Sequence, residues 1–164
     1  QGLANATFLA IPIFVAGSSN SGSLNIIQYV GLAVWLISII LETVADRQKL
    51  NFLRQMKITG LKNQVCNIGL WKYTRHPNYF FEWMVWNAMI LLTFTSFLQY
   101  FSVQDNVLWW ALGVALMYTS KLMYNTLVYY TGAIPSEYYS VQKRLGYKDY
   151  QKQTAMFFPS LPKK

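Results

Sequence analysis

Apolar residues gather into four runs along the chain, at residues 2–16, 26–44, 80–101 and 107–130. The last three have about the ~20 residues that an α-helix needs to cross a bilayer, and the first, at about 15, predicts a short or tilted span. A polar tail with repeated tyrosines follows the fourth run. The pattern predicts an all-α fold: a multi-pass transmembrane helical bundle of about four spans with a C-terminal amphipathic tail.

The segments between the runs predict how the helices connect. Residues 46–68 are polar, and Leu50, Leu53 and Met56 are spaced to form one apolar stripe, which predicts a separate amphipathic helix at the membrane interface. Pro77 disfavours helix at the residue before it, so the third span should follow a break in the backbone. The short link "SVQDN" between the third and fourth runs predicts an antiparallel hairpin.

The tail, residues 132–164, predicts short surface helices. Ser136 is placed to cap the N-terminus of a helix, and Gly146 should interrupt that helix. Tyrosine-rich amphipathic segments are typical of the headgroup level of a membrane.

Composition and charge agree with a membrane protein. Only 12% of the residues are charged, against about 25% in average soluble domains, while 54% are hydrophobic and the mean hydropathy is +0.21. The net charge of +8 comes almost entirely from two segments, residues 47–75 and 143–164. Basic residues confined to segments beside apolar spans mark one membrane side, so we expect no nucleic-acid partner.

The densest polar cluster is Arg75-His76-Pro77-Asn78, at the start of the third apolar run. A backbone interrupted by proline at membrane depth leaves polar groups that only protein or a wet cavity satisfies. Glu82 follows four residues after Asn78, on the same helical face, and an ionisable residue one turn into a span faces the bundle interior by default. Spacing alone leaves two interpretations open: the rim of a polar pocket on the basic side, or a helix cap with a structural salt bridge.

A second acidic pair, Glu42 and Asp46, shares one helical face beside Arg47 and Lys49. Two like charges at this spacing repel unless a cation or a ribose hydroxyl lies between them. The alternative is that both carboxylates are solvated at the membrane interface.

The remaining polar residues add one expectation and exclude several chemistries. Lys121 lies near the middle of the fourth run, where snorkelling is hard, so we expect a buried partner, with Glu82 a candidate. One histidine and one cysteine cannot build an ordinary zinc site, and no metal is expected. No Gly-rich phosphate loop follows a strand, and Cys66 is interpreted as a small buried residue.

The motifs resemble a known superfamily. The stretches "LETVADRQKLNF", "GLWKYTRHPNYFFE" and "TGAIPSEYYSVQKRLGYKDYQKQTAMFFPSLPKK" are similar to those of the steroid 5-alpha-reductase-like superfamily, and more closely to its branch known as a domain of unknown function. The resemblance runs from about residue 42 to the C-terminus. It implies that residues 1–164 are a single membrane domain, the C-terminal part of a longer 5-alpha-reductase-like chain.

The resemblance also implies a function. It implies NADPH as cofactor and reduction of a carbon–carbon double bond in a sterol or other lipid, with Arg75 and Lys49 meeting phosphates at the pocket rim. It leaves the catalytic residues unknown. Carried over by motif, the cofactor-binding residues would be Asp46, Lys49, Arg75, His76, Asn78, Tyr79, Glu82 and Tyr150.

Two other functions stay open at this point. A non-catalytic accessory subunit of a larger membrane complex, with a bound membrane lipid and neighbouring subunits as partners, is favoured by Phe81 and Tyr129, which stand where relatives usually have Gly and Arg. A membrane methyltransferase that uses S-adenosylmethionine is the third, because isoprenylcysteine carboxyl methyltransferases share the shorter "RHP-x-Y" pattern. The resemblance implies the endoplasmic reticulum; a mitochondrial or other organellar inner membrane is the alternative.

The charge distribution makes a prediction about topology. If the third and fourth runs form a hairpin, the basic segments 47–75 and 143–164 lie on the same membrane side. Single cysteines introduced into the two segments should therefore be labelled by an impermeant maleimide from the same side of sealed vesicles. Labelling from opposite sides would contradict the four-span topology.

Overall fold

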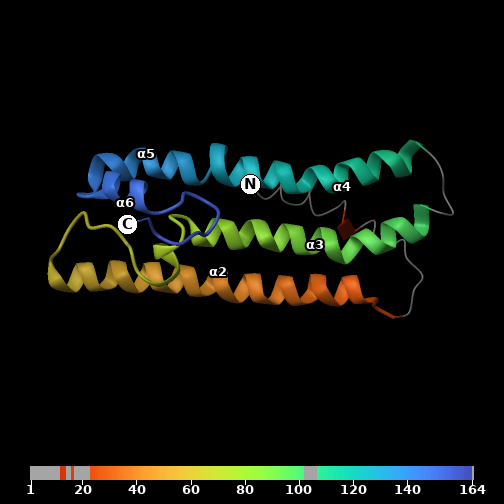
Figure 1. The fold of residues 1–164 in the computed structure, drawn as a ribbon, viewed down its shortest axis with the longest axis horizontal. Coiled ribbons are helices and arrows are strands. Elements are labelled where there is room, and N and C mark those ends of the chain that lie inside the picture. Colours follow the sequence, from red (N-terminus) through yellow and green to blue (C-terminus); the bar gives the residue numbers. More distant parts are fainter. Residues whose placement is uncertain (1–11, 14–15, 17–22, 102–106, 164) are drawn as a thin grey trace. The chain divides into compact units, whose positions relative to one another are not determined.

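The computed structural model describes residues 12–13, 16, 23–101 and 107–163, and the regular structure within them is helical. The expected first span, residues 2–16, falls largely outside these residues. The long helices are α2 (Ile26–Thr59), α3 (Pro77–Phe101) and α4 (Val107–Asn125), and α5 (Ala133–Lys143) and α6 (Tyr147–Gln153) follow them. Two short turns complete the order, a 3-10 turn η1 (Gly69–Lys72) and a π turn η2 (Thr126–Tyr130). The described part therefore confirms an all-helical fold (Figure 1).

The helices divide into two compact units. The first unit combines Gln1–Ile37 with Trp83–Tyr124, and the second combines Ser38–Glu82 with Asn125–Lys164. Each unit is described by itself below.

Helices α3 and α4 form an antiparallel hairpin in the first unit, as the short link predicts. Near the link, the rings of Phe97 and Trp109 stack with centroids 5.6 Å apart, and the Trp109 indole donates to the Phe97 carbonyl at 3.2 Å. At the other end, the Trp83 indole donates to the Ser120 carbonyl at 3.0 Å, and the Ser120 hydroxyl donates to Asn87 Oδ1 at 2.7 Å. These contacts fix the register of the two helices.

The N-terminal part of α2 packs closely on α3. Asn25 caps the helix, because its Oδ1 accepts the backbone N–H groups of Ile27 at 3.0 Å and Gln28 at 3.1 Å. The Gln28 side chain donates to the Leu92 carbonyl at 3.3 Å. One turn later, a Cβ on Gly31 would lie 3.0 Å from the backbone nitrogen of Leu92, so the absence of a side chain permits this approach.

Helix α2 is longer than the sequence predicts. The prediction of a span at residues 26–44 and a separate interfacial helix at 46–68 is wrong, since one helix of 34 residues runs from Ile26 to Thr59. Residues 45–59 contain no glycine or proline to interrupt the helix. The helix ends where Gly60 takes a left-handed conformation, with φ +70°. The change from apolar to polar residues near Asp46 thus marks a change of surroundings and not a helix end.

Two helices among the described residues are long and apolar enough to cross a membrane, Ile26–Thr59 and Pro77–Gln99. The fourth run yields an α-helix of 19 residues that gives way at Asn125 to the π turn. The count of four spans is therefore not confirmed and stays a prediction. Lys121 is exposed on α4, and its expected pairing with Glu82 would join the two units and also stays a prediction.

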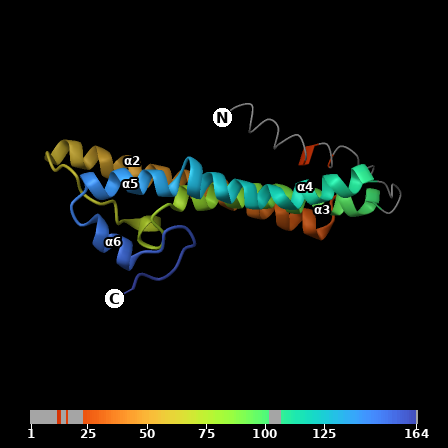
Figure 2. The same ribbon diagram turned by 90° about the horizontal axis from the view of Figure 1, so that it is seen from above.

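The second unit is assembled around the turn before α3. The Trp71 indole donates to the Ala45 carbonyl of α2 at 2.9 Å, and the Leu70 N–H donates to the Gln48 side chain at 2.9 Å. On the other side of the turn, the backbone N–H of Arg75 donates to the Ala155 carbonyl at 2.9 Å. Figure 2 shows α6 and the C-terminal segment beside this turn.

The tail contains the two helices that the sequence predicts, with one correction. Gly146, at φ +74°, separates α5 from α6 and confirms the predicted interruption. Ser136 does not cap a helix: α5 begins at Ala133, and the Ser136 hydroxyl donates back to the Ala133 carbonyl at 2.9 Å. A hydroxyl inside the first turn bonds backward along its own helix, which a cap at that position would not do.

Candidate functional site

A buried ion pair joins the turn before α3 to α5. Arg75 Nε lies 2.6 Å from Glu137 Oε1, and Nη2 lies 3.1 Å from Oε2, so the two side chains meet in a two-point contact. Arg75 Nη1 donates to the carbonyls of Gln151 at 3.0 Å and Thr154 at 2.5 Å. Four of the five N–H donors of this guanidinium are therefore bonded within the protein.

Glu137 is the centre of this network. His76 Nε2 lies 3.0 Å from Oε1, and the Gln151 amide donates to Oε2 at 2.6 Å. Burial alone would raise the pKa of the carboxyl, but the hydrogen bonds from His76, Arg75 and Gln151 lower that pKa to about 2. Glu137 is thus ionised at neutral pH although it is 7% exposed.

The structure places Arg75 among the residues that line a polar cavity, and its predicted contact with cofactor phosphates stays a prediction. Its side chain is buried, 8% exposed, and holds together the turn before α3, α5 and α6. The Arg-His-Pro-Asn cluster does break the backbone before α3, as predicted, but part of it serves as a structural salt bridge. Of the two interpretations left open by the spacing, the structural salt bridge is confirmed for Arg75, and the rim of a pocket on the basic side stays a prediction.

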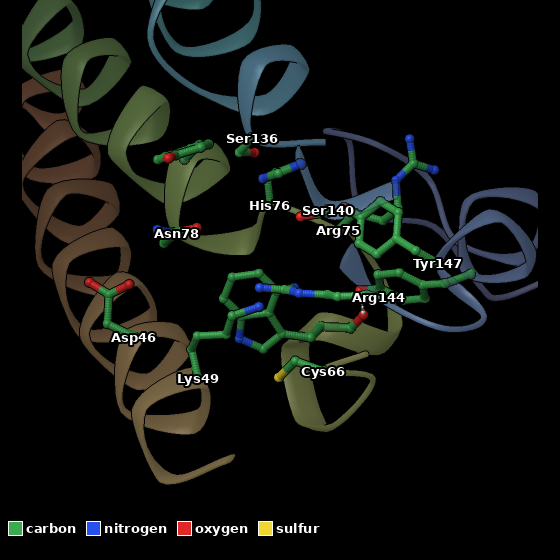
Figure 3. A pocket seen from close by; sticks show the side chains of 13 residues that line it. Asp46, Lys49, Cys66, Arg75, His76, Asn78, Ser136, Ser140, Arg144 and Tyr147 are labelled. Carbon is green, nitrogen blue, oxygen red and sulfur yellow. Dashed lines mark hydrogen bonds between the residues drawn. The ribbon is translucent and has the colours of Figure 1, made fainter. Parts of the chain in front are cut away.

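Beside the ion pair lies a polar cavity of about 220 Å³ (Figure 3). Its walls come from four parts of the second unit: the polar half of α2, the turn and first residues of α3, α5, and α6. Thirteen side chains line it: Asp46, Lys49, Cys66, Trp71, Arg75, His76, Asn78, Tyr79, Ser136, Ser140, Arg144, Tyr147 and Tyr150.

Lys49 and Arg144 bring positive charge to the cavity. The Lys49 ammonium lies 4.2 Å from the centre of the Trp71 ring, a cation–π distance. The charges of Lys49 and Arg144 repel each other. Among the described residues, neither side chain forms a salt bridge. Although the Asp46 carboxylate also lines the cavity, two cations outside any salt bridge of the described residues favour an anionic ligand between them.

Besides Asp46 and Arg75, most of the remaining lining residues are neutral and polar. Asn78 Oδ1 is buried and has no hydrogen-bond partner among the described residues, so it is an acceptor that lacks a donor. The Tyr79 ring stacks on His76 with centroids 5.4 Å apart. The Tyr150 hydroxyl donates to the Trp71 carbonyl and so fixes α6 against η1.

The thiol and the two tail tyrosines of the cavity are not activated nucleophiles. Burial raises the pKa of the Cys66 thiol, so the sulfur stays protonated at neutral pH. Burial, with a further contribution from Glu137, raises the pKa of Tyr147 to about 12, and burial also raises that of Tyr150. These groups are hydrogen-bond donors at neutral pH, which is suited to binding a ligand and not to attacking one.

The structure brings most of the predicted cofactor-binding residues together. Around the one cavity lie Asp46, Lys49, Arg75, His76, Asn78, Tyr79 and Tyr150, while Glu82 is not among its lining residues. Their role in cofactor binding stays a prediction. Sequence reasoning missed Glu137 and Arg144. Glu137 could have been noticed because it is one of only two carboxylates in the basic tail, the other being Asp149.

The fold and the cavity define an all-helical protein with membrane-length helices and a polar cavity beside a buried ion pair. Comparison with protein families adds that residues 1–154 match DUF1295, a family of proteins of unknown function, and the chain belongs to this family. The resemblance to the steroid 5-alpha-reductase-like superfamily stays a prediction. No curated protein and no solved structure matches the chain.

The ion pair predicts a large loss of stability on removal of Arg75. Arg75→Gln should lower the free energy of unfolding by about 3–5 kcal/mol, because Glu137 would be left as a buried charge without its main partner. The matched control is Lys152→Gln, which removes an exposed pair with Asp149 at 2.9 Å and should cost about 1 kcal/mol or less. Equal losses in denaturant titrations of the two variants would contradict a structural role for Arg75.

The lowered pKa of Glu137 predicts a pH dependence of stability. Because the folded-state pKa is about 2 and the ordinary value is 4.5, the stabilisation is fully present above about pH 4.5 and is lost as the pH falls toward 2. The free energy of unfolding of the wild type should therefore fall across this interval. Glu137→Gln should show a flatter profile there, and an unchanged slope would contradict the assignment.

Proposed function

We propose that this chain is a membrane-embedded, NADPH-dependent reductase of the 5-alpha-reductase-like type, acting on a carbon–carbon double bond in a sterol or another lipid. The observation that carries the proposal is the cavity with Lys49 and Arg144 facing one ligand space, neither of them in a salt bridge of the described residues. Phosphate groups match this arrangement, because charge-assisted hydrogen bonds to phosphate are short and strong. The motif resemblance to the wider superfamily supports the choice of cofactor.

The residues of the cavity fit a phosphorylated nucleotide. Lys49 and Arg144 would hold its phosphates, and Asn78 Oδ1 and Asp46 would accept hydrogen bonds from its hydroxyl or amide groups. The volume of about 220 Å³ lies below the ~300–1,000 Å³ of most small-molecule sites, so the cavity would take the phosphate-bearing part of the cofactor. When bound, NADPH supplies the hydride, and the protein binds and orients it.

The buried Arg75 changes the assignment of the phosphate contacts. Since its guanidinium is bonded to Glu137 and to two carbonyls, Arg144 takes the place that the motif gave to Arg75. Arg75 and His76 then act as positioning residues, because they fix the turn from which Asn78 and Tyr79 enter the cavity wall. Glu82 has no role in this binding proposal.

One observation favours the second candidate, an accessory subunit of a membrane complex. Much of the predicted site, namely Arg75, His76 and Tyr150, is engaged in hydrogen bonds that hold the fold together. A former cofactor pocket could retain these bonds for stability alone. The third candidate, a methyltransferase, is less suited to the cavity, because S-adenosylmethionine carries no phosphate for the two cations. The two membrane-length helices support a membrane location for the proposed activity. The endoplasmic reticulum by resemblance, or an organellar inner membrane as the alternative, stays part of the proposal.

The test is a titration of NADPH against the purified full chain in detergent. Arg144→Gln and Lys49→Gln should each lose a charge-assisted contact of about 1.5–3 kcal/mol, which is roughly a ten- to hundredfold increase in Kd. Matched controls are Lys143→Gln and Arg47→Gln, the exposed neighbours of the two cavity residues, which should leave the Kd nearly unchanged.

The alternatives give different results in the same experiment. An accessory subunit would show no NADPH affinity, and the cavity variants would matter only to assembly. Binding of S-adenosylmethionine in place of NADPH would support the methyltransferase. If the folded wild type binds no NADPH, the reductase proposal is wrong.

A further inference from the structure

The C-terminal part of α2 extends well beyond its apolar stretch. At a rise of 1.5 Å per residue, the apolar residues 26–44 cover about 28 Å, close to the ~30 Å hydrocarbon thickness of a bilayer. Because α2 continues without a break to Thr59, residues 45–59 carry the helix about 22 Å further along its axis. Side chains near this end therefore lie outside the hydrocarbon when α2 crosses a membrane.

Large apolar side chains are nevertheless exposed at this end. Leu53 is 45% exposed, Ile58 77% and Leu61, just after the helix, 57%. Neither lipid tails nor the described residues of the second unit cover them. Exposed apolar surface rimmed by polar residues typically marks an interaction site.

Leu53 and Leu61, but not Ile58, border a hollow of about 410 Å³ at the helix end. Leu53, Met56 and Leu61 supply its apolar lining, and Lys57 and Lys62 stand beside them. The backbone N–H of Leu145 donates to the carbonyl of Asn63 at 3.0 Å, which ties the turn after α2 to the end of α5. The hollow is thus part of the folded second unit.

The charge around the hollow has one sign. Between residues 47 and 81 the sequence contains no aspartate or glutamate, and Lys57 and Lys62 form no salt bridge among the described residues. An occupant that complements the hollow must therefore combine apolar side chains with carboxylates.

We propose that this hollow is a docking site for an acidic amphipathic segment of a partner protein. Apolar side chains of the partner fill the space between Leu53, Met56 and Leu61, and its carboxylates pair with Lys57 and Lys62. This is the mode in which an amphipathic helix places its apolar face in a groove.

Distance favours a protein over the surface of the membrane as the occupant. Lys57 lies 13 residues after Val44, or about 20 Å along the axis, whereas the headgroup layer on one side is only about 5–7 Å thick. Even at a tilt of ~40° the separation from the hydrocarbon is about 15 Å. The remaining gap to the headgroups reaches the Debye length of ~8 Å at physiological salt, so attraction to anionic lipids is largely screened.

The inference rests on the membrane insertion of α2, which is part of the proposed function, but not on NADPH binding. The docking proposal and the NADPH proposal therefore fail separately. A chain that binds no NADPH can still have the docking site. If carbonate washing releases the chain from membranes, α2 is not inserted and the docking proposal is wrong. Insertion is checked first by that extraction.

The experiment measures binding of a synthetic acidic peptide to the full chain in phosphatidylcholine nanodiscs by fluorescence anisotropy. The peptide places leucine along one helical face and glutamate on the other. A second peptide of equal charge carries glutamine in place of leucine, and a third carries lysine in place of glutamate. An environment-sensitive label on Leu61→Cys, which lines the hollow, reports contact there, with the labelled parent chain as background because Cys66 is 1% exposed.

The variants separate this site from general charge attraction. Lys57→Glu combined with Lys62→Glu should weaken binding of the acidic peptide by about tenfold or more and should allow the lysine peptide to bind. The matched control, Lys143→Glu combined with Lys148→Glu, makes the same charge change at exposed residues of α5 and α6 and should change the affinity by less than about threefold. The glutamine peptide should bind about tenfold more weakly than the leucine peptide.

Three results would overturn the proposal. Equal weakening by the two double variants, or equal binding of the leucine and glutamine peptides, would show attraction by net charge alone. A blue shift of the label in nanodiscs containing phosphatidylserine, without peptide, would identify the bilayer as the occupant. Absence of binding and of any shift with the leucine peptide would show that the hollow takes no acidic partner.

Discussion

The second unit depends on one buried ion pair. Arg75 and Glu137 are 62 residues apart in the chain, and both are almost completely removed from solvent. Two charges in such a position are tolerated only when hydrogen bonds satisfy their remaining donors and acceptors. Here His76 and Gln151 form hydrogen bonds with the carboxylate of Glu137. Two backbone carbonyls near the end of α6 accept hydrogen bonds from the guanidinium of Arg75. The pair therefore specifies how the turn before α3, α5 and α6 meet, and the cavity exists because they meet in this way.

The same constraint determines which charges remain for a ligand. Arg75 lines the cavity, but Glu137 neutralises it, so the net positive character comes from Lys49 and Arg144. The unpaired acceptor of Asn78 follows one turn after the ion pair and takes its position from it. The Arg-His-Pro-Asn motif thus contains two kinds of residue. Arg75 and His76 hold the cavity wall together through Glu137, and Asn78 offers an unpaired acceptor.

The sequence was sufficient for features that depend on local pattern. The apolar runs, the hairpin of α3 and α4, the break before Pro77 and the interruption at Gly146 all follow from periodicity or from backbone restrictions of single residues. The sequence was insufficient for the length of α2 and for the partner of Arg75. The continuation of α2 past Asp46 follows from the absence of a helix breaker, which the change of polarity obscured. The partner of Arg75 could not be found by spacing, since helical neighbours lie only three or four residues apart.

The distribution of charge along the chain links the fold to both proposed binding surfaces. Residues 47–81 hold seven cations and no carboxylate, so the nearest carboxylates in the sequence are Asp46 and Glu82 at the edges of this stretch. Arg75 is buried, and its counter-ion is Glu137 of the tail. This ion pair therefore connects the two chain segments that make up the second unit. Lys49 lines the polar cavity, and Lys57 lines the open hollow at the end of α2. Folding thus pairs Arg75, the buried cation of this stretch, and leaves Lys49 and Lys57 without a salt bridge among the described residues and available to anions from outside the chain.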